Sequence, residues 1–110
     1  MKVHLIKRQT IEDYVANNSQ SRSAFEHWLG LIKVADWITP ADIKSTFATA
    51  DILGQGSQRV VFDIGGNKYR MICKYHLGKN QAHLFVMWIG THAEYDKLCK
   101  GGGQYSVSKY

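Results

Sequence analysis

The sequence predicts an α+β fold in which N-terminal helices pack on a mostly antiparallel β-sheet. In the first half of the chain, apolar residues recur at intervals of three and four, which is typical of a helix with one buried face. In the second half, short apolar segments alternate with glycine-containing turns, which is typical of antiparallel strands. Helices followed by strands favour this fold class. The length of 110 residues, 45% of them hydrophobic, indicates one domain with one core.

The N-terminal third is expected to contain one strand and the first helices. Val3 to Ile6 is a short apolar strand. Thr10 and Asp13 resemble a capping arrangement, which predicts a helix from there through about Asn17. Residues 19–23 form a polar break before the second helix.

Two more helices follow in the first half. The second helix has one buried stripe, formed by Phe25, Trp28, Leu29 and Ile32. Thr39 and Pro40 are a cap residue and a proline at the first helical position, and Asp42 is an acid in the first turn. This start predicts a short helix that ends near Phe47.

The second half is expected to form a meander of antiparallel strands. Strands are predicted at residues 51–53, 59–64, 68–76 and 82–89. The segments Gly65-Gly66-Asn67 and Gly78-Lys79-Asn80 contain residues that tolerate positive φ, and they are read as turns between strands. A last helix is predicted from His92 to about Lys100. The domain should therefore span residues 1–100, with a loose glycine-rich tail over residues 101–110.

The charge of the chain bears on its partners. The formal net charge is +5 and the sequence pI is about 9.3. This favours polyanionic partners, with RNA or DNA first and an acidic protein as the alternative. Neither a secretory leader nor a membrane-spanning stretch is recognisable, so we expect a soluble cytoplasmic protein.

Metal and nucleotide chemistry have little support in the sequence. Cys73 and Cys99 lack metal-ligand spacing, and His76 and His83 have no clustered acids or cysteines. No GxGxxG or Walker-type loop is present. We expect neither a metal nor a cofactor.

Alternation along strand 68–76 separates an apolar face from a basic one. The first face carries Tyr69, Met71, Cys73 and Tyr75, which suits a helix-covered core. The second carries Lys68, Arg70, Ile72, Lys74 and His76. A surface of this kind attracts phosphates, so Lys68, Lys74 and His76 are candidate RNA contacts. The alternative is the solvated outer face of a half-covered sheet.

Arg70 is the strongest single candidate on that strand. Flanking strands would hold its base still, and a fixed planar guanidinium can grip a phosphate through two oxygens. The alternative is a structural salt bridge to a carboxylate such as Asp63.

The stretch IGTHAEYDK, residues 89–97, adds further candidates. An imidazole such as His92 can give or take a proton near neutrality. Tyr95 shares its helix face and could stack on a base, supply a hydroxyl or simply pack against the sheet. Lys97 is either a phosphate contact or a partner of the helix dipole.

These residue types suit cleavage of RNA through its own 2′-hydroxyl. That reaction needs a base for the hydroxyl, cations for the pentavalent phosphorane and an acid for the leaving oxygen, and it requires no metal. A non-catalytic RNA- or ribosome-binding protein would use the same basic face.

Two longer stretches carry a family resemblance. The chain closely resembles the HigB-type toxins of the RelE-like superfamily, most strongly over residues 59–98, in the stretches RVVFDIGGNKYRMICKY and HLFVMWIGTHAEYDKL. The resemblance extends more loosely to HLIKRQTIEDYV and WITPADIKSTFATADIL. It implies a toxin of a type II toxin–antitoxin system, an endoribonuclease that cuts mRNA on translating ribosomes and arrests growth. It also implies a HigA-like helix-turn-helix antitoxin, with operator DNA bound only through that antitoxin. A toxin that survives only as the binding partner of its antitoxin is a third interpretation.

The resemblance also implies roles for individual residues. The strand arginine that holds the scissile phosphate in RelE-like relatives corresponds to Arg70, and the basic or imidazole residue after the last strand corresponds to His92. The family tyrosine corresponds to Tyr95, with Tyr105 as the alternative. Relatives carry paired lysines or a glutamate on the preceding strand, where this chain has Val61 and Asp63. The general base is therefore open among His92, His76 and Lys68.

Overall fold

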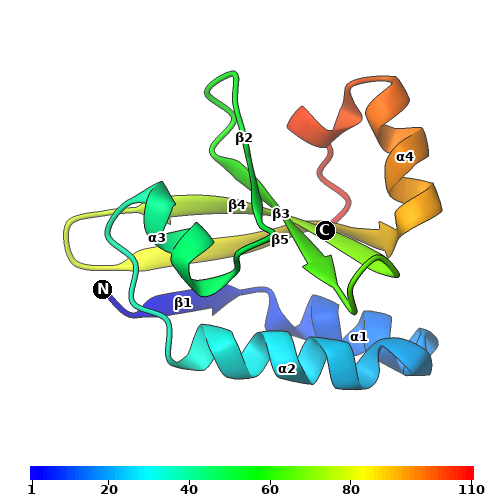
Figure 1. The fold of residues 1–110 in the computed structure, drawn as a ribbon, viewed down its shortest axis with the longest axis horizontal. Helices are drawn as coiled ribbons and strands as arrows, with labels where there is room; N and C mark the ends of the chain where they lie inside the picture. Colours follow the sequence, from blue (N-terminus) through cyan, green and yellow to red (C-terminus); the bar gives the residue numbers. More distant parts are fainter.

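The computed structural model describes residues 1–110 and has an α+β fold, as the sequence predicts (Figure 1). The elements in chain order are β1 (Val3–Ile6), α1 (Arg8–Asn17), a 3-10 turn (Ser19–Ser21), α2 (Arg22–Lys33), α3 (Pro40–Thr46), β2 (Asp51–Leu53), β3 (Arg59–Ile64), β4 (Tyr69–Leu77), β5 (Ala82–Thr91), α4 (His92–Lys100) and a second 3-10 turn (Gly103–Tyr105). The five strands form one sheet in the order β1-β5-β4-β3-β2. β1 runs parallel to β5, and the other neighbours are antiparallel.

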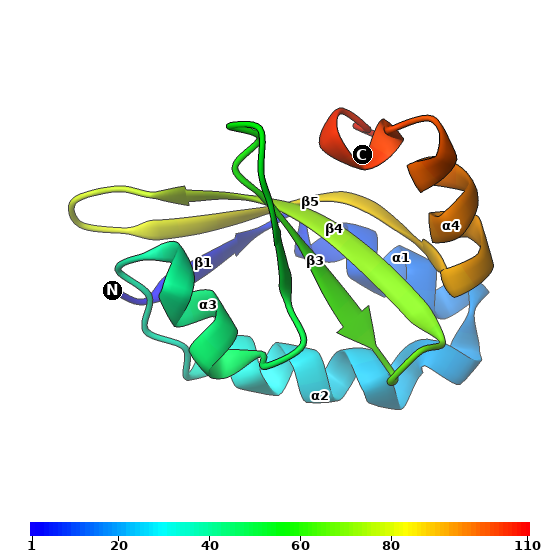
Figure 2. The ribbon, with the colours of Figure 1, turned by 45° about the horizontal axis from the view of Figure 1, so that its top comes forward.

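The main core lies between the sheet and the N-terminal helices. α2 runs beneath the sheet (Figure 2) and buries the predicted stripe, although Leu29 is only partly buried. The Trp28 ring contacts Phe62 of β3 edge-on at 5.2 Å and stacks on Phe47 at 5.7 Å. Met71 and Cys73 of β4 are fully buried in the same core, so the apolar face predicted for this strand is confirmed.

The two helix starts predicted from the sequence differ in outcome. The start at Pro40 is confirmed, because the Asp42 carboxylate accepts hydrogen bonds from the amides of Ile38 and Thr39 at 2.7 and 2.9 Å. The predicted cap at Thr10 is wrong, because α1 already begins at Arg8. Lys7, with φ of 68°, turns the chain directly from β1 into the helix.

β4 and β5 differ in detail from the expected strands. β4 begins one residue later than predicted, because residues 65–68 form a four-residue turn. The register shifts between Ile72, opposite Trp88, and Cys73, opposite Val86. The extra residue is Met87. A bulge of this kind changes which face the following side chain occupies, so it places Trp88 on the same face as Ile72.

The second face of the sheet is partly covered by α4 and the C-terminal residues, on the side opposite α2 (Figure 2). A smaller apolar cluster forms there from Leu53, Val61, Ile72 and Trp88. Side chains of α4 and the last residues pack against it, namely Tyr95, Leu98, Tyr105 and Val107. The second face is therefore covered at one end only.

The expectation of a loose tail is wrong, because the last residues fold back on the sheet. Arg59 is 7% exposed, and its Nη1 donates to the carbonyl oxygens of Val107 at 2.6 Å and Gln104 at 3.3 Å. The Lys109 amide donates to the Met87 carbonyl at 2.9 Å. These bonds satisfy a buried guanidinium and a backbone carbonyl, which would be costly to leave unpaired. None of the helices is both long and apolar enough to span a membrane.

Candidate functional site

Arg70 is the second residue of β4, the middle strand of the sheet. It lies opposite Asp63 of β3 and Gly90 of β5. Strands on both sides hold its backbone, as expected, and its side chain is only 9% exposed.

The guanidinium of Arg70 is held against the turn between β3 and β4. Its Nε lies 3.0 Å from the Asp63 carboxylate, so the ion pair that the sequence left as an alternative is present. Nη1 donates to the carbonyls of Tyr69 and Gly66, and Nη2 donates to the Asn67 side-chain oxygen. The Nη acceptors are all neutral. Because phosphate oxygens are stronger acceptors, a phosphate can displace them while Nε keeps its carboxylate.

The start of α4 is fixed beside that turn. Thr91 and Glu94 form a capping box, in which Thr91 N donates to the Glu94 carboxylate at 2.8 Å and Glu94 N donates to Thr91 Oγ1 at 3.2 Å. The His92 amide donates to the Lys68 carbonyl at 3.1 Å. The turn that holds Arg70 and the first residue of α4 are thus neighbours.

His92 presents its imidazole at the surface. The side chain is 49% exposed, and its Nε2 lies 3.7 Å from an Asp96 carboxylate oxygen one turn further along α4. An exposed imidazole near a carboxylate can exchange a proton with solvent or with a bound substrate.

Tyr95 points from α4 toward the sheet. Its ring lies 6.1 Å from that of Trp88, and both belong to the smaller apolar cluster. Burial, a hydrogen bond with the Cys99 side chain and the Asp51 charge raise the pKa of the Tyr95 hydroxyl, and nearby Arg70 opposes them. The hydroxyl is therefore protonated near neutral pH, so it can act as a hydrogen-bond donor and is a poor base.

Gly90 allows Trp88 to lie across the sheet beside Arg70. A Cβ added to Gly90 would lie 2.6 Å from Cζ2 of the Trp88 ring, too close for an ordinary contact. The Trp88 ring therefore occupies the space above the residue that pairs with Arg70.

The candidate residues separate into two groups along β4. Lys68 lies in the exposed turn beside His92, at the same end as Arg70. Lys74 and His76 are exposed on the other half of the strand, and His76 is six positions from Arg70, about 20 Å along a strand. Lys97 is exposed in the last turn of α4, two residues and therefore about half a helical turn from Tyr95. The structure thus gathers Lys68, Arg70, His92 and Tyr95 at one end of β4.

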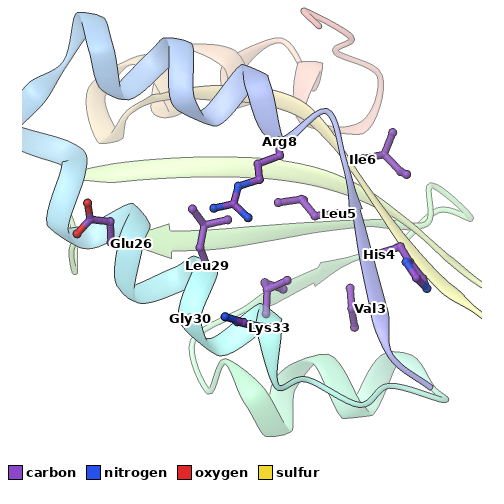
Figure 3. A pocket seen from close by; sticks show the side chains of 10 residues that line it. Val3, His4, Leu5, Ile6, Arg8, Glu26, Leu29, Gly30 and Lys33 are labelled. Carbon is purple, nitrogen blue, oxygen red and sulfur yellow. The ribbon is translucent and has the colours of Figure 1, made fainter.

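A groove of about 580 Å³ lies elsewhere, between β1 and α2 (Figure 3). Apolar side chains such as Leu5 and Leu29 line it together with Arg8, Glu26 and Lys33. It contains none of the candidate catalytic residues, so this groove is separate from the site at Arg70.

Sequence reasoning missed two residues that shape this site. The sequence indicates only a turn residue at Asn67, although the Asn67 side-chain oxygen accepts a hydrogen bond from Arg70 Nη2. The sequence indicates only a strand residue at Trp88, because the bulge at Met87 that turns this side chain toward the site depends on pairing with β4. The one available signal for Trp88 was the glycine two residues later.

The fold and the site define a small basic α+β protein with a strand arginine beside the start of its last helix. The family described as HigB_toxin, a RelE-like toxic component of a toxin-antitoxin system, matches residues 21–98. The chain belongs to this family and is a toxin of a toxin–antitoxin system. Among curated relatives, it is 29% identical over 98 residues to a protein named mRNA interferase HigB from Escherichia coli O6:H1 strain CFT073, an alignment that covers 89% of this chain and 93% of the relative.

Proposed function

We propose that this toxin is an endoribonuclease that associates with the ribosome and cleaves mRNA by a metal-independent reaction through the 2′-hydroxyl. The similarity to a protein named mRNA interferase supports the substrate class. The observation that carries the proposal is the placement of Arg70. A guanidinium fixed on the middle strand lies next to the turn that contacts His92, so a cation and a proton carrier are available at one end of β4.

We assign a separate task to each of three groups. The Nη edge of Arg70 binds the scissile phosphate and stabilises the negative charge that grows on it in the pentavalent state. The exposed imidazole of His92 transfers a proton. Tyr95 donates a hydrogen bond from its neutral hydroxyl, a role that agrees with its raised pKa. For the general base we favour His92 or Lys68 over His76, which is about 20 Å from Arg70 along the strand.

We further propose binding partners for the toxin. The RNA backbone is attracted by exposed cations and imidazoles, namely Lys68, Lys74, His76 and Lys97. A HigA-like helix-turn-helix antitoxin binds the toxin, and operator DNA is contacted only through that antitoxin.

The test is expression of the protein without its antitoxin. Growth should stop, and mRNA should be cut to fragments with 2′,3′-cyclic phosphate ends, mapped by primer extension and end-group analysis. Purified protein is tested on ribosome-bound mRNA in the Mg²⁺ that keeps ribosomes assembled, and an mRNA with a phosphorothioate at the cleavage site should be cut at the same rate with and without added Mn²⁺. A higher rate with Mn²⁺ would contradict the metal-independent reaction.

A non-catalytic ribosome-binding protein is the second candidate, and one observation favours it. The Arg70 guanidinium already has an acceptor at Nε, Nη1 and Nη2, as a purely structural arginine would. Growth arrest with intact mRNA would support this candidate and reject the enzyme.

A further inference from the structure

Three histidines lie side by side on the second face of the sheet. His4 of β1 pairs in register with His83 of β5, and His83 pairs with His76 of β4. The ring centroids of His4 and His83 are 5.7 Å apart, and those of His83 and His76 are 6.4 Å apart. Successive rings are tilted by only 33° and 32°. We call these three residues the histidine row.

The adjacent positions on the same face continue this surface. Phe85 of β5 lies opposite Lys74 of β4, and the Phe85 ring is 6.3 Å from that of His83 at an angle of 30°. His4, His76 and Lys74 are exposed, and His83 and Phe85 are partly exposed.

The side chains on this face of this half of the sheet are exposed or partly exposed, and the C-terminal residue meets the chain beyond β1, where Lys7 Nζ donates to the Tyr110 carbonyl. Contacts of the C-terminal residues on β5 reach Met87, where the Lys109 amide binds the Met87 carbonyl. In Figure 2 the free end of the β4–β5 hairpin extends away from α4 and the C-terminus. Four aromatic rings and a lysine are thus available to a partner.

We propose that the histidine row and Phe85 form a stacking surface for bases of single-stranded RNA. Rings of this kind stack on bases of any sequence, and neighbouring cations hold the backbone. Lys74 supplies such a cation, and no Asp or Glu belongs to this set of five residues. No group of three or more histidines, cysteines or acids is placed to hold one metal ion.

The distance between the histidine row and Arg70 determines how long an RNA must be to contact both. Arg70 and His76 lie on one strand and one face, about 20 Å apart. Stacked nucleotides follow one another at roughly 3.4 Å, so about six span this distance. The row would therefore bind nucleotides flanking the scissile phosphate, and in this respect the inference rests on the proposed function.

The test measures binding without cleavage. Full-length protein is titrated into fluorescent 2′-O-methyl oligoadenylates of about 12 and about three nucleotides, and anisotropy is recorded. The double variant His4→Ala/His83→Ala should bind the longer oligonucleotide about 5- to 100-fold more weakly than wild type, the loss that unstacked bases produce. Binding of the short one should not change. His83→Phe should keep wild-type affinity, since it retains a ring.

The control is His27→Ala, which removes an exposed histidine from α2 on the other side of the sheet and should have no effect. Unchanged affinity of the double variant, or no binding of the longer oligonucleotide by wild type, would overturn the inference. So would a variant that keeps its RNA affinity and loses affinity for the antitoxin, which would make the row a protein interface. Failure of the proposed function is seen separately, as absence of mRNA cleavage by the wild-type protein.

Discussion

Asp63 and Arg70 face each other across β3 and β4, with the carboxylate Oδ1 3.0 Å from the guanidinium Nε. The Arg70 side chain is 9% exposed and that of Asp63 is 27% exposed. A nearly buried cation is therefore compensated by an anion that still reaches water, and this pair orients the Nη edge of the guanidinium. The contribution of this ion pair to stability and the proposed role of Arg70 in cleavage can be tested separately.

Asp63→Asn should lower the free energy of unfolding by about 1–3 kcal/mol, because it leaves a buried cation without its anion. The measurement is urea unfolding followed by tryptophan fluorescence. Glu12→Gln is the matched control. It removes the exposed pair between Arg8 and Glu12, at 3.6 Å, and should cost at most about 0.5 kcal/mol. Equal effects of the two variants would show that the pair at Arg70 adds no particular stability.

Arg70→Ala should reduce mRNA cleavage on ribosomes by about a hundredfold or more, the effect of losing about 3 kcal/mol of transition-state stabilisation. Ribosome and antitoxin binding should be retained, since other cations remain. Arg70→Lys should restore little activity, because an ammonium cannot form the two-pronged contact. Single-turnover cleavage rates are compared after circular dichroism verifies folding. An unchanged cleavage rate in Arg70→Ala would reduce Arg70 to a structural ion-pair partner.

His92→Gln should lower the cleavage rate by about a hundredfold or more while ribosome affinity is kept, because glutamine cannot carry the proton. Asp96→Asn is the control. It keeps the imidazole and removes only an exposed carboxylate 3.7 Å away, so we expect a change of no more than a few-fold. If His92→Gln cleaves at the wild-type rate, the proton carrier is a different residue.

Deletion of residues 103–110 should destabilise the fold by about 2 kcal/mol or more. It uncovers the apolar cluster around Trp88 and removes both acceptors of the buried Arg59 guanidinium. Arg59→Met in the full-length protein should also destabilise the fold, since it leaves the Val107 and Gln104 carbonyls without their donor. In the truncated chain the Arg59 guanidinium faces water, so the same substitution should change the stability by at most about 0.5 kcal/mol. Wild type, the truncated chain and each of these two with Arg59→Met are compared by urea unfolding. If the truncated protein is as stable as wild type, the C-terminal residues do not contribute to the stability of the fold.

Stability should fall as the pH rises from about 10 toward about 12. Burial, with the Glu94 charge as the next cause, raises the pKa of Tyr14 from 10.0 to about 12, and burial also raises the pKa of Tyr95 and Tyr110. Folding thus favours the neutral phenols. The stability that these neutral phenols contribute is fully present below the pKa of tyrosine in the unfolded chain. It is lost as the pH rises through the higher pKa of the folded protein. Urea midpoints across this range should decline less steeply in Tyr14→Phe, and equal slopes would contradict this assignment.

Local chemistry accounts for what could be predicted about the fold. The proline and the acid after Thr39 start α3 by bonds within a few residues, and the stripe containing Phe25 and Trp28 needs only helical periodicity. The placement of Arg70 between neighbouring strands also follows from local pattern, because strand alternation and a glycine turn define one β-hairpin.

The sequence by itself thus determined the fold class, the order of the elements, the apolar face of β4 and the position of Arg70 on a paired strand. Only the tertiary structure decided the bulge at Met87, the docking of the C-terminal residues on Arg59 and the alignment of His4 with His83 and His76. The physical reason is the range of the interactions involved. Strand register and the burial of a tail depend on contacts between segments far apart in the chain, and no local pattern of residues specifies them.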